Sequence, residues 1–296
     1  MKLKHSVSGI NISLLQILFT VFTVLGVLVR TYQRFTQIES DTGFYKEINF
    51  PNTFFMVFII LVPLIFIVLS FLSSEAKSLN VKNNNSRVLF AVSMAASLGF
   101  VYDAVKSAAD AAELNSSYLG SGFNEIPFLK ARTVFAVLSA VYMVFLSLSA
   151  KGKIKKASKL FLLPLAPAVW SAVRLFPLFA HEISYIQVSD LFSEIFMLVF
   201  ASLFFFYLAS AISGIGFEGY SYKLVAYGLS VAFLSAVINI PKFIATVIDA
   251  ESYIVSEYPL SAVDFMVFLF ALSLVVTTLN CERDEEKPLE AEINKD

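Results

Sequence analysis

The sequence predicts an all-α, polytopic transmembrane helical bundle of about eight spans. Hydrophobic residues make up 57% of the 296 residues and charged residues only 15%, whereas soluble domains have about 45–50% and about 25%. The apolar residues also gather into runs of about 20, the length that a helix needs to cross the hydrocarbon core of a bilayer. A soluble fold of this size could not bury so much apolar surface, whereas a bilayer covers it.

Eight apolar runs divide the chain. In order, they cover residues 10–29, 53–73, 88–102, 133–150, 160–180, 191–215, 224–248 and 260–279. Asp103 interrupts the third run, and we expect the helix to continue beyond it. The seventh run contains Asn239, Pro241 and Lys242, so we expect a kink or an early end there, which leaves seven spans as the alternative.

The two ends of the chain differ in character. Lys2 and Lys4 precede the first run as in a signal peptide, but the run is longer than a usual signal core and no A-x-A site follows it. We therefore interpret the first run as a retained span and residues 1–280 as one transmembrane domain. Residues 281–296 are acidic and contain no aromatic residue, so we expect a disordered cytoplasmic tail.

The distribution of Lys and Arg predicts the orientation. With a cytoplasmic N-terminus, most Lys and Arg residues fall on inner segments and most acidic residues on outer ones. The basic loop 151–159, between the fourth and fifth runs, contributes most to this bias, and positive loops remain inside. We therefore expect both termini in the cytoplasm, which requires an even number of spans.

Polar and ionisable residues interrupt the apolar runs at a similar depth in the bilayer. At about 1.5 Å per residue, all six fall in the outer third of the bilayer: Asp103, Arg174, Glu194, Asn239, Lys242 and Asp264. Such residues usually face water or a protein interior, which favours an outward-facing charged cavity for a solute or ion. The alternative is a set of ion pairs between helices, with Lys242 extending to the interface. Arg174 lies deepest, and we expect Asp103 or Glu194 as its partner.

The third run carries two helical patterns. Small residues recur every four positions at Ala91, Ala95 and Gly99, which favours close helix packing. Beyond them, polar residues three or four positions apart share one face, which predicts either a solvated helix end or the mouth of the cavity. These polar residues are Asp103, Lys106, Asp110 and Glu113. The complete candidate set for the cavity is Asp103, Lys106, Asp110, Arg174, Glu194, Asn239, Lys242 and Asp264.

The fifth run contains three prolines, Pro164, Pro167 and Pro177, on either side of Trp170 and Arg174. Each proline inside a helix frees a backbone carbonyl. Broken helices of this kind build binding sites in many transporters, although prolines also occur in ordinary membrane helices.

No catalytic motif is present. The zinc-protease, serine-hydrolase, P-loop and dinucleotide-binding patterns are absent. The single triplet Asp41-Thr-Gly43 lacks the second carboxylate that an aspartic protease needs, and a turn explains it. With one Cys and two His, we expect no metal and no cofactor, and a net charge of −1 gives no indication of nucleic acid binding.

Short motifs give one resemblance. Arg30-Thr-Tyr-Gln33, then Asp41-Thr-Gly-Phe44, and later Ser193-Glu194 before an aromatic-rich stretch to Phe206 resemble uncharacterised multi-pass membrane proteins of Gram-positive, clostridial-type bacteria. The resemblance implies a bacterial plasma-membrane location and no particular activity.

Three functions remain open. The first is a transporter of a small solute or ion that uses the outer charged layer. The second is a non-catalytic membrane component, either an assembly partner of another membrane protein or a ligand sensor. The third is a membrane-embedded enzyme, which the absence of motifs disfavours. The lipid bilayer is the one expected partner in all three, and the oligomeric state remains open.

Overall fold

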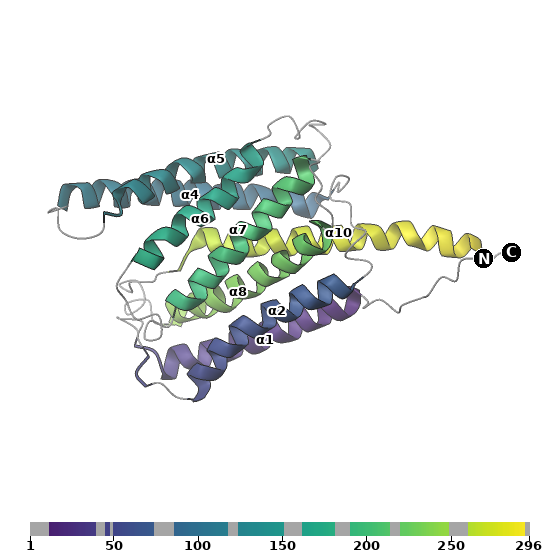
Figure 1. Cartoon of the computed structure of the whole chain (residues 1–296), viewed down its shortest axis with the longest axis horizontal. Helices are drawn as coiled ribbons and strands as arrows, with labels where there is room; N and C mark the ends of the chain where they lie inside the picture. The colour runs from purple at the N-terminus through teal and green to yellow at the C-terminus, as the bar shows by residue number, and fades with distance from the viewer. Residues whose placement is uncertain are drawn as a thin grey trace.

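The structure is a computed structural model that describes residues 12–39, 45–47, 50–73, 86–117, 124–150, 162–180, 190–213, 220–248 and 260–293. Helices account for nearly all of these residues (Figure 1). In chain order they are α1 (Ile12–Thr36), α2 (Phe50–Leu72), α4 (Arg87–Ser117), α5 (Ile126–Ala150), the 3-10 turn η3 (Leu163–Leu165), α6 (Ala166–Ala180), α7 (Leu191–Ser213), α8 (Tyr220–Ile248) and α10 (Ala262–Ile293).

Each predicted apolar run overlaps one of these α-helices. Within the described residues, seven helical segments are long and apolar enough to cross a membrane, and a shorter apolar helix, Ala262–Thr277, forms the start of α10. These helices fit a multi-pass membrane protein, and the predicted fold class is confirmed. α1 begins, and α10 leaves the bundle, at the same end (Figure 1).

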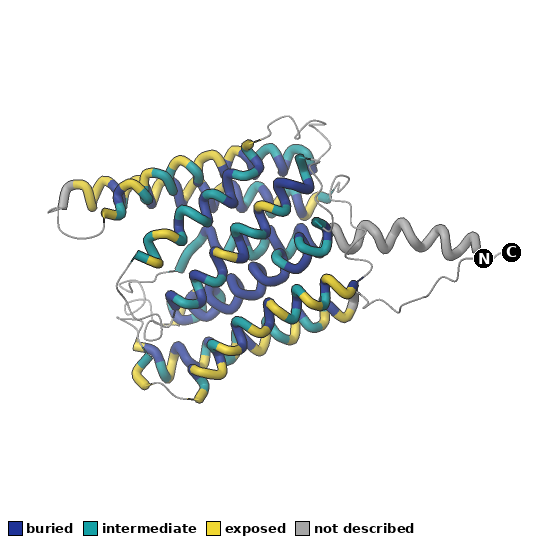
Figure 2. The backbone as a smooth tube through the Cα atoms, in the orientation of Figure 1, coloured by how far each residue is buried: buried dark blue, intermediate teal, exposed yellow. Residues whose placement is uncertain are grey.

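Six helices form a closed ring. α4 packs against α5, α5 against α6, α6 against α7, α7 against α8, α8 against α10, and α10 returns to α4. The pair α1 and α2 packs against α8 from outside this six-helix ring. α8 therefore lies between the other ring helices and the pair, and most of its length is buried (Figure 2).

Glycines allow close helix approaches. A Cβ atom on Gly228 of α8 would lie 2.6 Å from Cγ2 of Val275 in α10, and one on Gly26 of α1 would lie 2.7 Å from Cγ2 of Val237 in α8. Gly99 of α4 lies against α10, where a Cβ would meet Cγ of Met266 at 3.1 Å. The close packing predicted for the third run is therefore present at Gly99.

Aromatic side chains fill the middle of the six-helix ring. The rings of Phe100 and Trp170 meet edge to face with centroids 4.8 Å apart, and Phe205 stacks on Phe270 at 6.2 Å. All four are fully buried, as is Phe204, which contacts Phe205 and Phe270. We call these five residues the aromatic floor.

Proline effects differ from helix to helix. α4 continues through Asp103 to Ser117, as expected. In the fifth run, η3 and the start of α6 accommodate the first two prolines, and Pro177 lies inside α6. The early end expected for the seventh run is wrong, because α8 continues through Pro241 to Ile248. Packing of α8 against α1, α2, α7 and α10 offsets the roughly 3 kcal/mol that an interior proline costs.

The end of α10 also differs from expectation. The helix continues to Ile293, into the segment 281–296 for which a disordered tail was predicted. Glu occurs five times in this segment, and Glu favours helix. The side chains after Thr277 lie outside the part of the molecule that is described.

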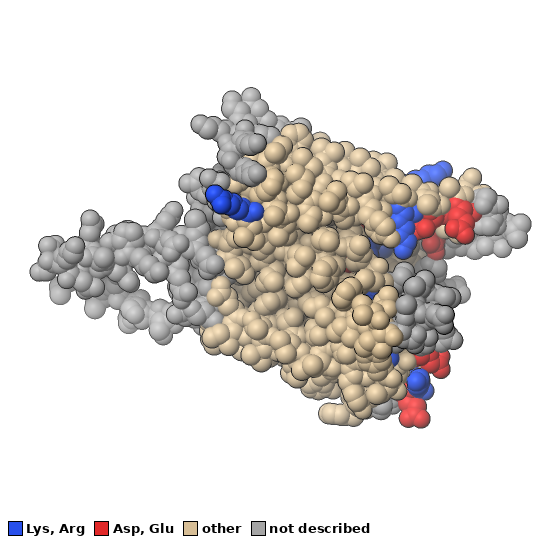
Figure 3. All heavy atoms as spheres, turned by 180° about the vertical axis from the view of Figure 1, so that it is seen from behind, with Lys and Arg blue, Asp and Glu red and all other residues tan. Residues whose placement is uncertain are grey.

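The surface separates apolar from charged regions. Figure 3 shows a broad uncharged surface over the middle of the bundle, with most of the visible charged side chains gathered at the end where α4 and α5 project. Large apolar side chains are exposed on the described helices, among them Leu28, Leu64, Leu98 and Val105. An uncharged belt of this kind is what a lipid-facing surface requires.

Candidate functional site

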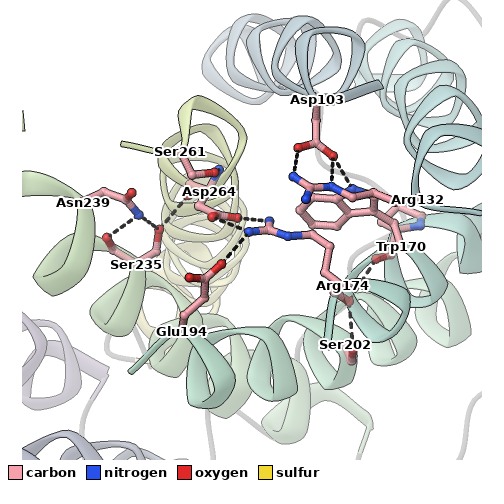
Figure 4. Close-up of polar contacts among 12 residues, drawn as sticks. Asp103, Arg132, Trp170, Arg174, Glu194, Ser202, Ser235, Asn239, Ser261 and Asp264 are labelled. Carbon is pink, nitrogen blue, oxygen red and sulfur yellow. Dashed lines mark hydrogen bonds and ion pairs between the residues drawn. The ribbon is translucent and has the colours of Figure 1, made fainter. Parts of the chain in front are cut away.

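Charged side chains from five helices meet inside one end of the six-helix ring (Figure 4). Asp103 lies on α4, Arg132 on α5, Arg174 on α6, Glu194 on α7 and Asp264 on α10. α4 and α6 approach this end while α5, α7 and α10 begin there, so residues far apart in the sequence reach the same level. We call these five residues the charged network.

Arg174 is held by two carboxylates. Its Nη1 donates to Oδ1 of Asp264 at 2.5 Å and its Nη2 to Oδ2 at 3.0 Å, so this pair is bidentate. Nη2 also donates to Oε1 of Glu194 at 3.0 Å. The expected pairing with Glu194 is therefore present, whereas Asp103 bonds to other residues. Arg174 is only 7% exposed and Asp264 only 4%, and such burial of a charge requires close partners.

Asp103 is occupied on both oxygens. Arg132 donates to it through Nε at 3.0 Å and through Nη2, and Nε1 of Trp170 donates to Oδ2 at 2.8 Å. Sequence reasoning missed Arg132, because the fourth run was predicted to begin at residue 133 and α5 begins at Ile126. Arg132 is one residue before that run, a position from which a long side chain can reach into a bundle.

Trp170 joins the charged network to the aromatic floor. The guanidinium carbon of Arg174 lies 4.8 Å from the centroid of the Trp170 ring, within range of a cation–π interaction. The same ring packs on Phe100 and donates to Asp103. Trp170 and Arg174 are four residues apart on α6, and this spacing places them on one face of a helix.

α8 contacts the charged network through the backbone of Asp264. The hydroxyl of Ser235 donates to the backbone carbonyl of Asp264 at 2.6 Å, and Nδ2 of Asn239 donates to the carbonyl and hydroxyl oxygens of Ser235. Asn239 thus reaches Asp264 through Ser235, and it does not line the cavity beside the network.

A cavity of about 420 Å³ adjoins the charged network. Lys106 on its wall is exposed, and the side chain of Arg132 is 24% exposed, so solvent reaches it. Apolar residues of α5 and α6, including Phe128, Val173 and Leu178, form part of the wall. The charged residues that line the cavity are Asp103, Lys106, Asp110, Glu125, Arg132, Arg174 and Glu194. Five of them belong to the predicted set: Asp103, Lys106, Asp110, Arg174 and Glu194.

Lys242 belongs to a second buried cluster, around Asp190. Oδ1 of Asp190 accepts from Nη2 of Arg30 at 2.6 Å, Oδ2 accepts from Nη2 of Arg34 at 2.6 Å, and Nζ of Lys242 lies 3.3 Å from Oδ2. These four residues, the Asp190 cluster, join α1, the start of α7 and α8, and each is at most 5% exposed. Lys242 does not line the cavity. It does not extend to the surface either, because it is buried beside Asp190.

Polar neighbours hold Arg30 in place. Its Nη1 donates to Oε1 of Gln33 at 3.1 Å and to the hydroxyl of Tyr45 at 3.0 Å. Nε2 of Gln33 in turn donates to the carbonyl of Pro51 and to Oδ1 of Asn52. The Arg30-x-x-Gln33 pattern thus binds α1 to the start of α2. The Asp41-Thr-Gly43 triplet lies outside the described residues.

The surroundings of Asp190 determine its ionisation. Burial alone would raise the pKa of this carboxyl group, but Lys242, Arg34 and Arg30 hold the pKa well below the usual carboxyl range. Asp190 is therefore ionised at neutral pH. Sequence reasoning placed Asp190, Arg30 and Arg34 in outer loops, and nothing in the sequence indicated that they meet.

Nothing in the described part of the chain brings three or more His, Cys, Asp or Glu side chains together in a way that could hold a metal ion. Comparisons with protein-family models, with curated proteins and with solved structures find no match. The function is therefore inferred from the geometry of the cavity and of the charged network.

Proposed function

We propose that the protein transports a small solute or ion across the membrane and binds it in the cavity of about 420 Å³. The observation that carries the proposal is the position of this cavity inside a ring of apolar helices, with charged residues from α4, α5, α6 and α7 in its wall. Ionisable groups within membrane helices are expensive, and they commonly mark a solute or ion pathway.

The closed floor supports transport with alternating access. Phe100 and Trp170 lie about one helical turn deeper than Asp103 and Arg174, and both are fully buried. A cavity that solvent reaches from one end, with packed aromatic rings about one helical turn beyond its charged residues, is expected of one state of a transporter, in which helices later move to expose the other end. Trp170 contacts both the floor and the charged network, so it is the side chain through which a bound solute would influence the floor.

The basic loop 151–159 supports an outward-facing cavity. α5 ends at Ala150, at the end of the bundle opposite the cavity, and the basic residues follow it in the sequence. Positively charged loops remain cytoplasmic. On this proposal, the protein is in the plasma membrane of a bacterium and takes up its solute from outside.

A second candidate is a non-catalytic membrane component, such as an assembly partner or a ligand sensor. One observation favours it: Asp103 and Arg174 already have close partners within the protein, so the network also fits a purely structural role. Such a protein would bind no transported solute and would co-purify with a membrane partner in mild detergent.

Uptake by the purified full chain in proteoliposomes tests the proposal. Thermal stabilisation is first screened against a panel of amino acids, amines, organic acids and inorganic ions, and each stabilising compound is then assayed for uptake. We expect uptake to be lost in Arg174→Ala and retained in Lys223→Ala, a cation at the opposite end of the bundle that contacts Tyr207 and Tyr222. Unchanged uptake in Arg174→Ala, or no uptake of any compound, contradicts the proposal.

A further inference from the structure

The charged groups around the cavity differ in how fully they are paired. Arg132 holds Asp103 through two nitrogens, and Arg174 holds Asp264 through two nitrogens. Each of these bidentate pairs is neutral as a unit. An anionic solute would have to compete with a buried carboxylate for either guanidinium, and separating a buried ion pair is costly.

Two lining carboxylates are not part of those pairs. Glu194 accepts from Arg174 through Oε1 alone, from a nitrogen that also serves Asp264, and its side chain is 19% exposed. Asp110 is half-buried on α4. The one lining cation outside the pairs is Lys106. Glu125 also lines the cavity, but it interacts with another group of the protein, so we leave it out of this count of charges. The net charge of these described lining residues, two acids and one base, is therefore negative.

Apart from Tyr102 and Ser261, the rest of the wall is apolar. Val173, Pro177 and Leu178 of α6 face the same cavity as Phe128 and Leu129 of α5. A hydrated metal ion or a proton would make no favourable contact with this apolar surface. A solute with a hydrocarbon body would cover it, and its charged end would meet the carboxylates. This combination of a few placed polar groups with an apolar wall is typical of small-molecule sites.

We propose that the transported solute is a small organic cation with an aliphatic body, an amine or a diamine, and that Glu194 and Asp110 bind its ammonium groups. This inference rests on the proposed function and adds the chemical class of the solute. Glu194 comes from α7 and Asp110 from α4, so a diamine could meet carboxylates on two different helices. Lys106, one turn from Asp110, then limits affinity for cations.

Three compounds with the same four-carbon length test the charge preference. Putrescine carries a positive charge at each end, 4-aminobutyrate one of each sign, and succinate a negative charge at each end. Binding of each compound to the full chain in nanodiscs is measured by isothermal titration calorimetry. We expect putrescine to bind most tightly, 4-aminobutyrate less tightly, and succinate not detectably.

Four variants test which residues bind the ammonium groups. Glu194→Gln and Asp110→Asn keep side-chain shape and remove charge, and each should weaken putrescine binding by about tenfold or more, the worth of one charged hydrogen bond. Lys106→Gln should strengthen it, because a like charge is removed. Glu113→Gln, an exposed acid on the same helix that does not line the cavity, should leave it unchanged. Lys106→Gln and Asp110→Asn change residues near the surface, so they remain informative if Glu194→Gln proves unstable.

The outcomes separate this inference from the transport proposal. If succinate binds more tightly than putrescine, or if Lys106→Gln weakens putrescine binding, the cation assignment is wrong while transport of another solute still stands. If an anionic or neutral compound from the wider panel is taken up and no cation is, the same conclusion follows. If no compound is bound or taken up at all, both proposals fail.

Discussion

Nε1 of Trp170 donates a 2.8 Å hydrogen bond to Oδ2 of Asp103, and this contact connects the aromatic floor to the charged network. On its other side, the same indole lies under the guanidinium of Arg174. A rotation of the Trp170 ring would therefore disturb an acid, a base and the packing on Phe100 together. Trp170 therefore contacts the charged network and the buried aromatic packing at the same time.

Trp170→Phe is expected to destabilise the protein. The smaller ring still packs on Phe100, but Asp103 loses a buried donor, which costs about 1.5–3 kcal/mol for a charged acceptor. The midpoint of thermal unfolding in mild detergent measures the effect. Tyr142→Phe is the matched control, because the buried hydroxyl of Tyr142 makes no hydrogen bond to any described residue. Equal loss of stability in the two variants would show that the indole hydrogen bond contributes nothing.

Asp190→Asn is expected to be among the most destabilising single changes. It leaves Arg30, Arg34 and Lys242 around a neutral side chain, and removing one partner from buried ion pairs costs about 3–5 kcal/mol. The same thermal unfolding assay measures this loss. Asp110→Asn makes the same chemical change at a half-buried site on the cavity wall and should alter stability by no more than about 0.5 kcal/mol. A small effect at Asp190 would mean that the cluster is not a structural centre.

Acid is expected to remove the stabilisation that Asp190 provides. Its pKa in the folded protein is held well below the usual range, whereas the unfolded chain has a carboxyl pKa of about 3.9. The stabilisation is therefore fully present above about pH 5, and it is lost as pH falls past the unfolded pKa toward the folded pKa. The difference in unfolding free energy between wild type and Asp190→Asn should be constant from neutral pH to about pH 5 and should narrow below that. A difference that widens in acid would contradict this sign.

Gly26→Ala is expected to separate α1 from α8. The added Cβ would lie 2.7 Å from Cγ2 of Val237, a buried β-branched side chain with little freedom to move, and such overpacking costs about 1–3 kcal/mol. Val237→Ala removes the obstructing methyl groups. The double variant should therefore lose less stability than the sum of the two single variants. A purely additive result in this double-mutant cycle would show that the two residues do not interact.

The sequence alone was sufficient for the helices and for the level of the charges. Bilayer thickness requires apolar runs of one length, so each run could be counted before any contact was known. A fixed rise per residue then placed Asp103, Arg174 and Asp264 at one level. The boundaries of α5 and α8 were less accurate, because Arg132 and Pro241 lie within helices whose ends depend on packing against neighbours.

Only the tertiary structure decided which charges meet. Arg174 and Asp264 are 90 residues apart, and Arg30 and Asp190 are 160 apart. Lys242 and Asn239 lie on the same helix at nearly the same depth. Lys242 pairs with Asp190 at the start of α7, whereas Asn239 bonds to Ser235, which in turn donates to Asp264 of α10. Depth in the membrane follows from position along the chain, whereas partnership depends on which helices are neighbours and how each is rotated about its axis. Side-chain packing across the whole bundle determines both, so the cavity and the Asp190 cluster appear as separate sites only in the folded protein.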